Sequence, residues 1–292
     1  MLASSQTPSP LSFEVDRIYQ HLHEIANSHP LDSFDLNGLN SLLGGVYPGR
    51  MTAIAGSPGS GKTTLLLQMA DDLCHKGHHV LFVTTEMAPH ELVKKSISRL
   101  TGGELSVSDV PSAVSQFINN ESSALKGALE AYHGIATNLL FTTDHSIKGI
   151  ENLVTMIEER YQQPPVIMMD YIQRAATTAM YEKGSSDERS LIAQYVFELS
   201  EISKKHKSPV FAISTMVRNN YSSKNPDLKS CGGSAAIEYE FDSVVFLTSS
   251  EQPDDGAELK KCTVVAQKNR YAQSGKAELL FDGACATFKD LP

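Results

Sequence analysis

The sequence predicts an α/β fold in which helices flank a mostly parallel central sheet, preceded by a short helical arm at the N-terminus. Short apolar runs, such as residues 166–169 and 210–213, alternate with amphipathic stretches along the chain. Several of these runs are continuously apolar, which is typical of strands covered on both faces. Regular alternation of strands and helices favours parallel strands joined by right-handed crossovers. We therefore expect an arm over residues 1–30 and one catalytic domain over residues 31–292.

The individual elements follow from local patterns. Residues 1–12 are small and polar and are expected to be disordered, whereas residues 13–26 have apolar positions at helical spacing, and His29-Pro30 ends that helix. We expect the strands at 51–55, 80–85, 139–142, 166–171, 210–214, 244–248, 263–267 and 277–281. We expect the helices at 62–75, 89–100, 147–161 and 189–205, a partly helical stretch at 105–136, and a polar loop at 175–187.

Composition narrows the class of protein. The chain has 292 residues, of which 41% are hydrophobic and 20% charged, and this suits a globule with a sizeable core. Its apolar runs are too short to cross a bilayer, and its first residues lack the pattern of a secretory signal. Its four cysteines form no Cys-x-x-Cys pair. The pattern predicts reduced thiols, a cytoplasmic location and no zinc framework.

Residues 56–63 read Gly-Ser-Pro-Gly-Ser-Gly-Lys-Thr, which matches the phosphate-loop pattern G-x-x-x-x-G-K-[ST]. The loop follows an apolar strand and precedes an amphipathic helix, so its backbone N–H groups can surround a phosphate at a helix N-terminus. Lys62 would contact the β- and γ-phosphates, and the Thr63 hydroxyl would bind Mg²⁺. The sequence therefore predicts an ATP site made by Gly56, Ser57, Pro58, Gly59, Ser60, Gly61, Lys62, Thr63 and Thr64.

Two acids follow apolar strands and can serve this site. Asp170 ends the run Val-Ile-Met-Met, as a Walker B aspartate does, and with Thr63 it is the predicted metal site. Glu86 follows the strand at 80–85, and carboxyl ends of neighbouring parallel strands converge on a ligand, so Glu86 is the candidate base for water. The alternatives are a turn or helix cap for Asp170 and a solvated helix N-terminal acid for Glu86.

Over residues 34–290 the sequence resembles the motor domain of the DnaB family of ring-shaped replicative helicases, and more distantly the RadA and KaiC branches. The segments that carry the resemblance are Glu86-Met87, Asp170-Tyr-Ile-Gln173, residues 209–218, residues 237–242 and Lys268-Asn-Arg270. The resemblance implies a RecA-like P-loop NTPase that uses ATP and Mg²⁺. It also implies a homo-oligomeric ring, hexameric in the family, and a loader or replication protein as partner. From the resemblance we expect that these residues do not include the family's helical N-terminal domain.

The resemblance also implies roles for residues far from the phosphate loop. Lys268 and Arg270 match a pair that the family inserts into the nucleotide site of the next subunit, where an arginine stabilises charge on the γ-phosphate. The alternative is a solvated basic hairpin. Thr215 stands where the family has a sensor glutamine, and a threonine reaches the γ-phosphate less easily. The expected catalytic set is Lys62, Glu86, Asp170, Thr215, Lys268 and Arg270.

A net charge of −9 at first argues against a nucleic-acid partner, but basic residues gather within 216–233 and 258–276. A ring needs positive charge only on the loops that face a strand in its pore. The resemblance implies that one such loop binds the phosphates of single-stranded DNA. The alternative is an ordinary exposed loop, and residues 175–188 are a weaker second candidate. The expected DNA-binding residues are Arg218, Lys229, Ser230, Gly232 and Gly233.

The sequence thus predicts a ring ATPase that couples ATP hydrolysis to movement on single-stranded DNA and to duplex unwinding in replication. One alternative is a regulatory or loading ATPase that controls a protein partner, and another is a recombination ATPase of the RadA type. The helix at 13–26 either docks on a neighbouring motor domain or packs on its own core. His75, His78 and His79 lie close in sequence, but no cysteine or acid in register completes a metal site.

Overall fold

The computed structural model describes residues 30–117, 123–181, 187–217, 226–232, 234–249, 259–271 and 274–291. The expected arm helix at 13–26 lies outside these ranges. The strands are β1 (Met51–Gly56), β2 (Val80–Thr84), β3 (Leu139–Thr142), β4 (Val166–Asp170), β5 (Val210–Thr215), β6 (Ser243–Ser249), β7 (Lys260–Asn269), β8 (Lys276–Asp282) and β9 (Thr287–Asp290). The helices are α2 (Asn37–Leu43), α3 (Lys62–His75), α4 (Pro89–Leu100), α5 (Val110–Phe117), α6 (Ser123–Ala136), α7 (Ile147–Tyr161), α8 (Ile172–Tyr181), α9 (Glu188–His206), the short 3-10 helix η3 (Leu228–Ser230) and α10 (Ser234–Glu240).

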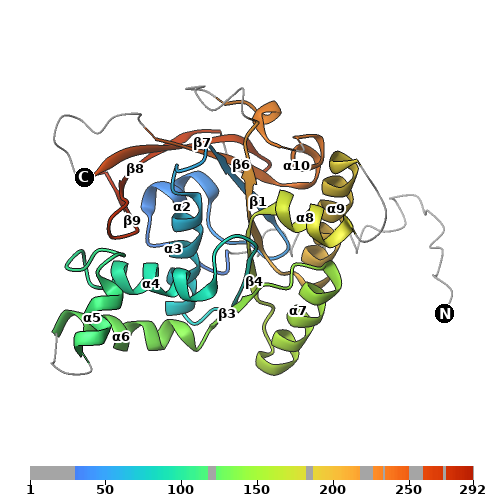
Figure 1. The fold of residues 1–292 in the computed structure, drawn as a ribbon. Helices are drawn as coiled ribbons and strands as arrows, with labels where there is room; N and C mark the ends of the chain where they lie inside the picture. The colour runs from blue at the N-terminus through green and yellow to red at the C-terminus, as the bar shows by residue number, and fades with distance from the viewer. Residues whose placement is uncertain are drawn as a thin grey trace, which may run out of the picture.

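In these ranges the strands form one sheet in the order β3-β2-β4-β5-β1-β6-β7-β8-β9 (Figure 1). The strands from β3 to β6 in this order are parallel to their neighbours. β7, β8 and β9 extend the sheet as an antiparallel meander. The prediction of a mostly parallel sheet is therefore confirmed. The centre of the sheet is β1, the strand that leads into the phosphate loop.

Helices cover both faces of the sheet, as the continuously apolar strands predicted (Figure 1). Side chains alternate along each strand, so in β1 Ile54 packs on the face that carries α2 and α3. Ala53 and Ala55 pack on the opposite face with α7, α8 and α9. A smaller apolar cluster joins α4, α5 and α6 and gives the partly helical stretch at 105–136 a core of its own. That cluster contains Ile97, Val110, Leu125 and Ala128.

The polar loop expected at 175–187 is wrong over its first half, because α8 continues to Tyr181. Ala175 and Ala176 are buried there and belong to the apolar layer that includes α9. Alanine has the highest helix propensity, and its small side chain lets the two helices pack closely. Helices α2 and α10 and strand β9 were also not expected, since each is too short to show a clear period.

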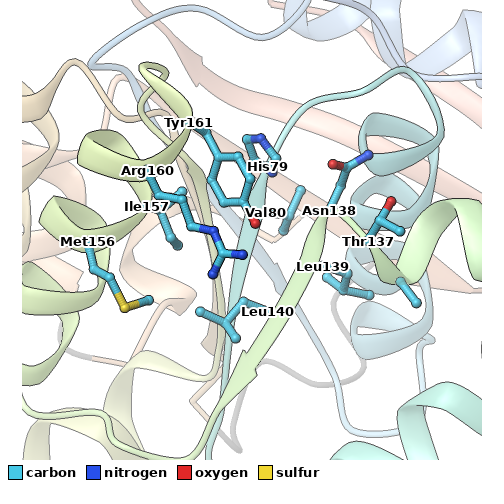
Figure 2. Close-up of a pocket in the computed structure, with 11 residues that line it drawn as sticks. His79, Val80, Thr137, Asn138, Leu139, Leu140, Met156, Ile157, Arg160 and Tyr161 are labelled. Atoms are coloured by element: carbon cyan, nitrogen blue, oxygen red, sulfur yellow. The ribbon is translucent and has the colours of Figure 1, made fainter.

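A hollow of about 190 Å³ lies beside the edge strand β3, between the start of β2 and the end of α7 (Figure 2). His79 stacks on the ring of Tyr161 with 3.7 Å between ring centroids, and Leu140 and Met156 are partly exposed at its rim. The hollow is at the amino ends of the parallel strands. It is therefore separate from the carboxyl edge, where β1 leads into the phosphate loop.

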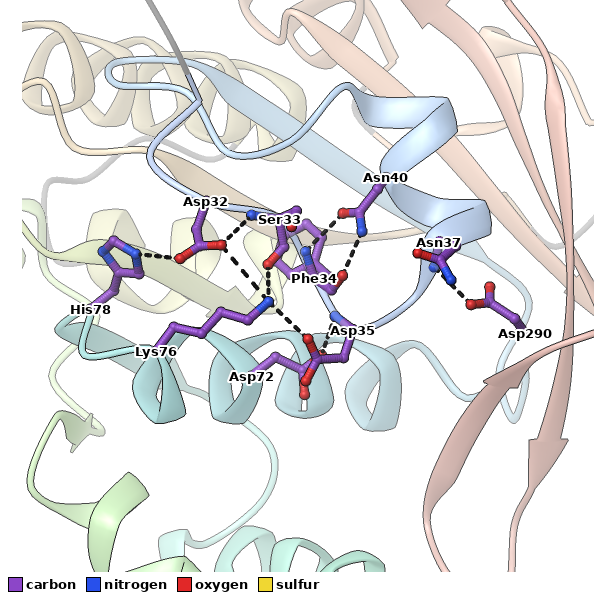
Figure 3. Close-up of polar contacts among 10 residues, drawn as sticks. All are labelled: Asp32, Ser33, Phe34, Asp35, Asn37, Asn40, Asp72, Lys76, His78 and Asp290. Carbon is purple, nitrogen blue, oxygen red and sulfur yellow. Dashed lines mark hydrogen bonds and ion pairs between the residues drawn. The ribbon is translucent and has the colours of Figure 1, made fainter.

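Ion pairs and hydrogen bonds connect residues 32–35, which precede β1, to the end of α3 and the residues that follow it (Figure 3). Lys76 Nζ lies 2.8 Å from Asp35 Oδ1 and donates to the Ser33 carbonyl at 2.6 Å. His78 Nε2 is 3.0 Å from Asp32 Oδ2, and Lys76 Nζ is 3.8 Å from the other oxygen of the same carboxylate. The Asp72 carboxylate accepts the Asp35 N–H at 3.2 Å. Burial, and then the nearby Asp35 and Asp71 charges, raise the pKa of Asp72 to about 6.

We expect the variant Asp72→Asn to be more stable than the wild type at pH 7.5, by roughly 1–3 kcal/mol in the free energy of unfolding. The pKa of Asp72 is raised above its ordinary value in the folded protein, so the fold favours the neutral carboxyl. Wild-type stability is then lost as pH rises between about 4 and 6, whereas an asparagine side chain at this position cannot ionise. Urea unfolding at pH 5 and pH 7.5 measures the difference.

The control Glu130→Gln, which changes an exposed acid on α6, should alter the free energy of unfolding by less than about 0.5 kcal/mol. Equal or lower stability of Asp72→Asn at pH 7.5 would contradict the expectation.

Within the described residues, no helix is both long and apolar enough to cross a bilayer. The four cysteines are unpaired, and all are buried.

Candidate functional site

The phosphate loop leaves β1 at Gly56 and enters α3 at Lys62. Gly61 has φ +94°, a left-handed conformation that favours glycine. A Cβ at this position would lie 2.8 Å from the ring of Phe288 and 3.2 Å from that of Phe281. These two rings stack with 4.4 Å between centroids and pack against the loop. Glycine is therefore required both by the backbone and by the aromatic pair beneath it.

Lys62 folds back over the loop. Its Nζ donates to the carbonyls of Gly56 at 2.9 Å and Ser57 at 2.8 Å. Burial lowers the pKa of Lys62 to about 8, while the negative charges of Asp170 and Glu86 oppose that shift. The lysine head group thus lies at the centre of the loop with two acids close by. A phosphate oxygen is the natural acceptor for such a partly buried ammonium group.

Asp170 ends β4 beside the end of β2, with Thr84 as its register partner. It is buried, and its Oδ2 has no hydrogen-bond partner among the described residues. Burial raises the pKa of Asp170 to about 6; the Thr63 hydroxyl lowers it and the Glu86 charge raises it. A hydroxyl and an unpartnered carboxylate are oxygen ligands of the kind that Mg²⁺ prefers. Thr63 and Asp170 therefore fit the metal site that the sequence predicted.

These groups line a cavity of about 450 Å³ at the carboxyl edge of the sheet. Glu86 and Thr215 also line it, so the structure brings five of the predicted catalytic and metal residues around one space. They come from different elements because parallel strands end on the same side. The residues lining the cavity are Pro58, Gly59, Gly61, Lys62, Thr63, Thr64, Glu86, Met87, Lys95, Asp170, Tyr171, Ile213, Thr215 and Phe281.

Lys95 is a cavity residue that the sequence reasoning missed. It lies on α4, and its Nζ donates to the Thr64 hydroxyl at 3.3 Å. Burial lowers its pKa, and the Asp170 charge acts in the opposite direction. A second partly buried cation beside the phosphate loop can contribute to binding a polyphosphate. The only signal in the sequence is a lysine within the first turns of the helix after Glu86, which by itself is indistinguishable from a solvated lysine.

Gln173 belongs to the Asp-Tyr-Ile-Gln motif, and its side chain makes a specific set of contacts in the structure. It lies on α8 with a side chain that is 7% exposed. Its Nε2 donates to the Ser214 hydroxyl at 2.9 Å and to the Gly232 carbonyl at 2.7 Å. Its Oε1 accepts the Thr215 N–H at 3.1 Å. One amide therefore joins α8, the end of β5 and the segment that starts the predicted DNA loop.

Lys268 and Arg270 lie at the end of the sheet opposite the phosphate loop. Register places Ser243 of β6 beside both Asn269 and Thr52, the second residue of β1. At about 3.3 Å per residue, the start of β1 is roughly 15 Å from Gly56. The two basic residues are therefore too far away to contact Lys62 of their own chain.

The contacts of this basic pair are with α10 and the residues after it. Lys268 Nζ donates to the carbonyls of Glu238 and Phe241, a favourable place for a cation because helix carbonyls point there. Arg270 Nη1 lies 3.1 Å from Asp242 Oδ1, and its Nη2 donates to the Tyr239 carbonyl at 2.6 Å. The Arg270 side chain remains 46% exposed. It is thus held in place within its own chain and still accessible from outside.

The residue after Arg270 takes part in an aromatic stack. The Arg50 guanidinium lies between the rings of Tyr47 and Tyr271, 3.7 Å and 3.6 Å from their centroids. Such cation–π contacts fix a planar cation against two faces. Arg50 precedes β1, so the stack connects the basic hairpin to the start of the central strand.

The predicted DNA-binding residues divide into three groups. Arg218 and Gly233 lie outside the described residues. Ser230 is buried, with its hydroxyl donating to Asp227 Oδ1 at 2.9 Å, and the Gly232 N–H donates to the Thr215 carbonyl at 2.8 Å. Lys229 is exposed. Of the described residues in this set, Lys229 is therefore the side chain most accessible to a strand.

Comparison with known proteins identifies the family to which this chain belongs. The family model for the DnaB-like helicase C-terminal domain matches residues 33–290. The chain belongs to this family. The resemblance stated from the sequence over 34–290 is thereby confirmed, and the DnaB-like match includes the phosphate loop, both acids and the basic hairpin.

Curated relatives agree with the DnaB-like assignment. Replicative DNA helicase DnaB of Mycoplasma genitalium is 25% identical over 262 residues, which is 86% of this chain and 54% of that protein. The DnaB of Helicobacter pylori strain 26695 is 22% identical over 214 residues, 72% of this chain and 42% of that protein. DNA repair protein RadA of Streptococcus pyogenes serotype M6 is 43% identical over only 63 residues, 21% of this chain and 14% of that protein. The chain spans about half the length of the DnaB relatives it matches.

Solved structures show the same fold. One solved ATPase domain has a TM-score of 0.79 at 20% identity, and the match covers 98% of this chain and all of that chain. A DnaB-like replicative helicase, solved in a study of its interactions with primase, has a TM-score of 0.80 at 18% identity. This second match covers 99% of this chain and 69% of that chain. The predicted RecA-like fold is confirmed.

Proposed function

We propose that the protein is a ring-forming ATPase that couples hydrolysis of Mg·ATP to movement on single-stranded DNA and to duplex unwinding. The observation that carries the proposal is the position of its polar and charged side chains. Lys62, Thr63, Glu86 and Asp170 line one cavity at the carboxyl edge of the sheet, while Arg270 lies partly exposed at the other end. A site of this kind is completed by a second copy that presents its Arg270 to the cavity.

Each group has a chemical task in this proposal. Mg²⁺, held by Thr63 and Asp170, would supply positive charge to the β- and γ-phosphates. Lys62 binds the same phosphates through its ammonium group, and Lys95 adds charge beside Thr64. Glu86 orients a water molecule and accepts its proton. Arg270 of the neighbouring copy stabilises the charge that develops on the transferred phosphoryl group.

The proposal is tested by ATPase rate with and without oligo-dT, together with strand displacement from a forked duplex. Stimulation by oligo-dT, and unwinding that requires a single-stranded tail and ATP, are the expected results. Electron microscopy with a non-hydrolysable ATP analogue and oligo-dT is expected to show a closed ring. An ATPase that is indifferent to DNA, from protein that stays monomeric with saturating Mg·ATP, would rule the proposal out.

We expect the variant Lys229→Ala to bind single-stranded DNA more weakly. Lys229 is exposed at the start of the predicted DNA loop. Each phosphate contact contributes about 0.7 to the slope of the logarithm of the association constant against the logarithm of the salt concentration. Loss of one contact therefore weakens binding roughly fivefold at 0.1 M salt. Fluorescence anisotropy of labelled oligo-dT over a salt series measures both quantities. The control Lys148→Ala removes an exposed lysine from α7 and should leave the slope unchanged. An unchanged slope for Lys229→Ala would remove Lys229 from the interface.

A second function is favoured by one observation. In the part of the predicted DNA loop that the structure describes, Ser230 is buried and the amide and carbonyl of Gly232 are both used internally. A nucleotide-controlled ATPase that regulates or loads a protein partner needs few DNA contacts. Unchanged ATPase rate on DNA, with nucleotide-dependent binding of a replication protein, would favour this second function.

A further inference from the structure

The end of β5 is shared by the nucleotide cavity and the segment at 226–232. Thr215 lines the cavity, and its carbonyl accepts the Gly232 N–H at 2.8 Å. Two residues further on, the Val217 N–H donates to the Ser230 carbonyl at 2.8 Å, and Met216 and Cys231 form an isolated antiparallel bridge. Segment 226–232 is therefore attached to β5 by backbone hydrogen bonds at the point where β5 reaches the nucleotide.

Gln173 contacts both segments of this junction and follows the candidate metal ligand Asp170. It lies three residues after Asp170 in sequence, on the first turn of α8. Its carbonyl oxygen accepts from Thr215 and its amide nitrogen donates to Gly232, so a single side chain contacts both partners of the junction. The amide nitrogen also donates to the Ser214 hydroxyl, which satisfies its second hydrogen. A buried amide with its hydrogens and oxygen all paired has one orientation, because rotation would leave polar atoms unpaired.

Gly232 leaves little space around this amide. A Cβ at Gly232 would lie 3.0 Å from the Thr215 hydroxyl and 3.4 Å from Gln173 Nε2. The three residues are thus in close packing, and a shift of the Thr215 backbone must be taken up by Gln173 or Gly232. Packed groups of this kind move between discrete arrangements rather than by gradual deformation.

We propose that Gln173 is the positioning residue that couples the nucleotide cavity to the DNA-contacting segment 226–232. When the γ-phosphate is contacted at Thr215, the end of β5 and the Gln173 amide move together, and Gly232 follows through its hydrogen bonds. In this protein the Gln173 link takes the place of the direct contact that a long sensor side chain would make. Such a link is needed because the Thr215 side chain is short and lies between the two sites. This inference rests on the proposed function, because it assumes that segment 226–232 contacts single-stranded DNA.

The test compares binding of oligo-dT in the presence of a non-hydrolysable ATP analogue and in the presence of ADP. The ratio of the two dissociation constants is the coupling factor, and factors of about five- to 150-fold are typical of coupled sites. Gln173→Met keeps the length and apolar volume of the side chain and removes its hydrogen bonds. We expect the coupling factor of Gln173→Met to fall to near one, with the affinity for the analogue alone within about threefold of wild type. Gln173→Glu keeps the acceptor for Thr215 but places an oxygen against the Gly232 carbonyl, and should also lose coupling.

Gln68→Met is the matched control. Gln68 is 6% exposed, donates to the Phe288 carbonyl at 3.0 Å and accepts the Phe288 N–H at 2.8 Å. It is therefore a buried glutamine with comparable hydrogen bonds, but it joins α3 to β9 rather than β5 to the segment. Gln68→Met should lower stability and keep the wild-type coupling factor. A folded Gln173→Met that keeps the wild-type factor would overturn the inference.

A measurement on the wild type covers the case in which the variants do not fold. Hydrogen–deuterium exchange of peptides from 226–232 should change on binding the analogue in the absence of DNA. No change there, with protection of the phosphate loop, would overturn the inference. If wild-type protein fails to bind oligo-dT, the proposed function fails, whereas the exchange experiment still reports whether the cavity and the segment are linked.

Discussion

Replacing Glu86 with glutamine is expected to lower the turnover number for ATP by about 10²–10⁴-fold. Glu86 lines the cavity, and its charge is felt by both Lys62 and Asp170. Glutamine keeps the shape of the side chain but cannot accept a proton from water. Binding of Mg·ATP should change much less than turnover, because the phosphate loop and Lys62 are unaltered. Steady-state ATPase kinetics and titration of a fluorescent ATP analogue measure the two quantities separately.

Glu91→Gln is the matched control for this prediction. Glu91 lies in the first turn of α4, pairs with Lys94 at 2.5 Å on the surface, and does not line the cavity. Its loss should leave turnover close to that of the wild type. If Glu86→Gln retained more than a tenth of the wild-type turnover, Glu86 would be one of the ordinary helix N-terminal acids, and another group would have to orient the water.

Arg270→Ala is expected to lower ATP turnover by about 10³–10⁵-fold, the effect of removing an arginine supplied to a phosphoryl-transfer site. Arg270 lies too far from its own phosphate loop to act there, as the register of β1, β6 and β7 shows. Its effect should therefore be seen in the assembled protein. Affinity for the nucleotide in a single copy should be retained. Measurement of turnover against protein concentration, alongside mass determination of the assembly, tests both points.

Mixing two inactive variants separates action between copies from action within one copy. In an equimolar mixture of Arg270→Ala and Glu86→Gln, roughly a quarter of the interfaces would contain an intact Glu86 and an intact Arg270 by random assembly around a ring. Activity should reappear on mixing. Lys276→Ala, which removes an exposed cation from the start of β8, should be active by itself. Failure to regain activity on mixing would mean that Arg270 acts through its contact with Asp242 in its own chain.

Much of the candidate site could be predicted because its parts are local. The phosphate loop is a continuous segment whose glycines and lysine stand in one pattern, and Asp170 and Glu86 each follow an apolar strand. Parallel strands bring such ends together, so membership of the same cavity follows from the fold class. Lys95 and Gln173 could not be assigned in this way. Each is an ordinary helical residue until the packing of α4 and α8 brings it to the cavity or to β5.

The incorrect loop prediction has the same cause. The loop expected at 175–187 contains small and polar residues, and only burial of Ala175 and Ala176 in the layer that includes α9 shows that its first half is helical. The DNA-binding role of Ser230 stays a prediction, and the structure shows that its hydroxyl is buried and donates to Asp227 where the segment folds back on the end of β5. The contacts that decide how these two segments fold come from α9 and from the end of β5, which are distant from them in the sequence.

The phosphate-loop motif, the parallel α/β fold and the family could all be inferred from the order of residues, because each depends on short patterns or on the order of strands and helices. The positions of the long-range partners became visible only in the folded chain. The fold placed Arg270 at the far end of the sheet from its own phosphate loop and joined Gln173 to both Thr215 and Gly232. The physical reason is that strand register and the packing of buried side chains depend on the whole sheet, and no local pattern encodes them.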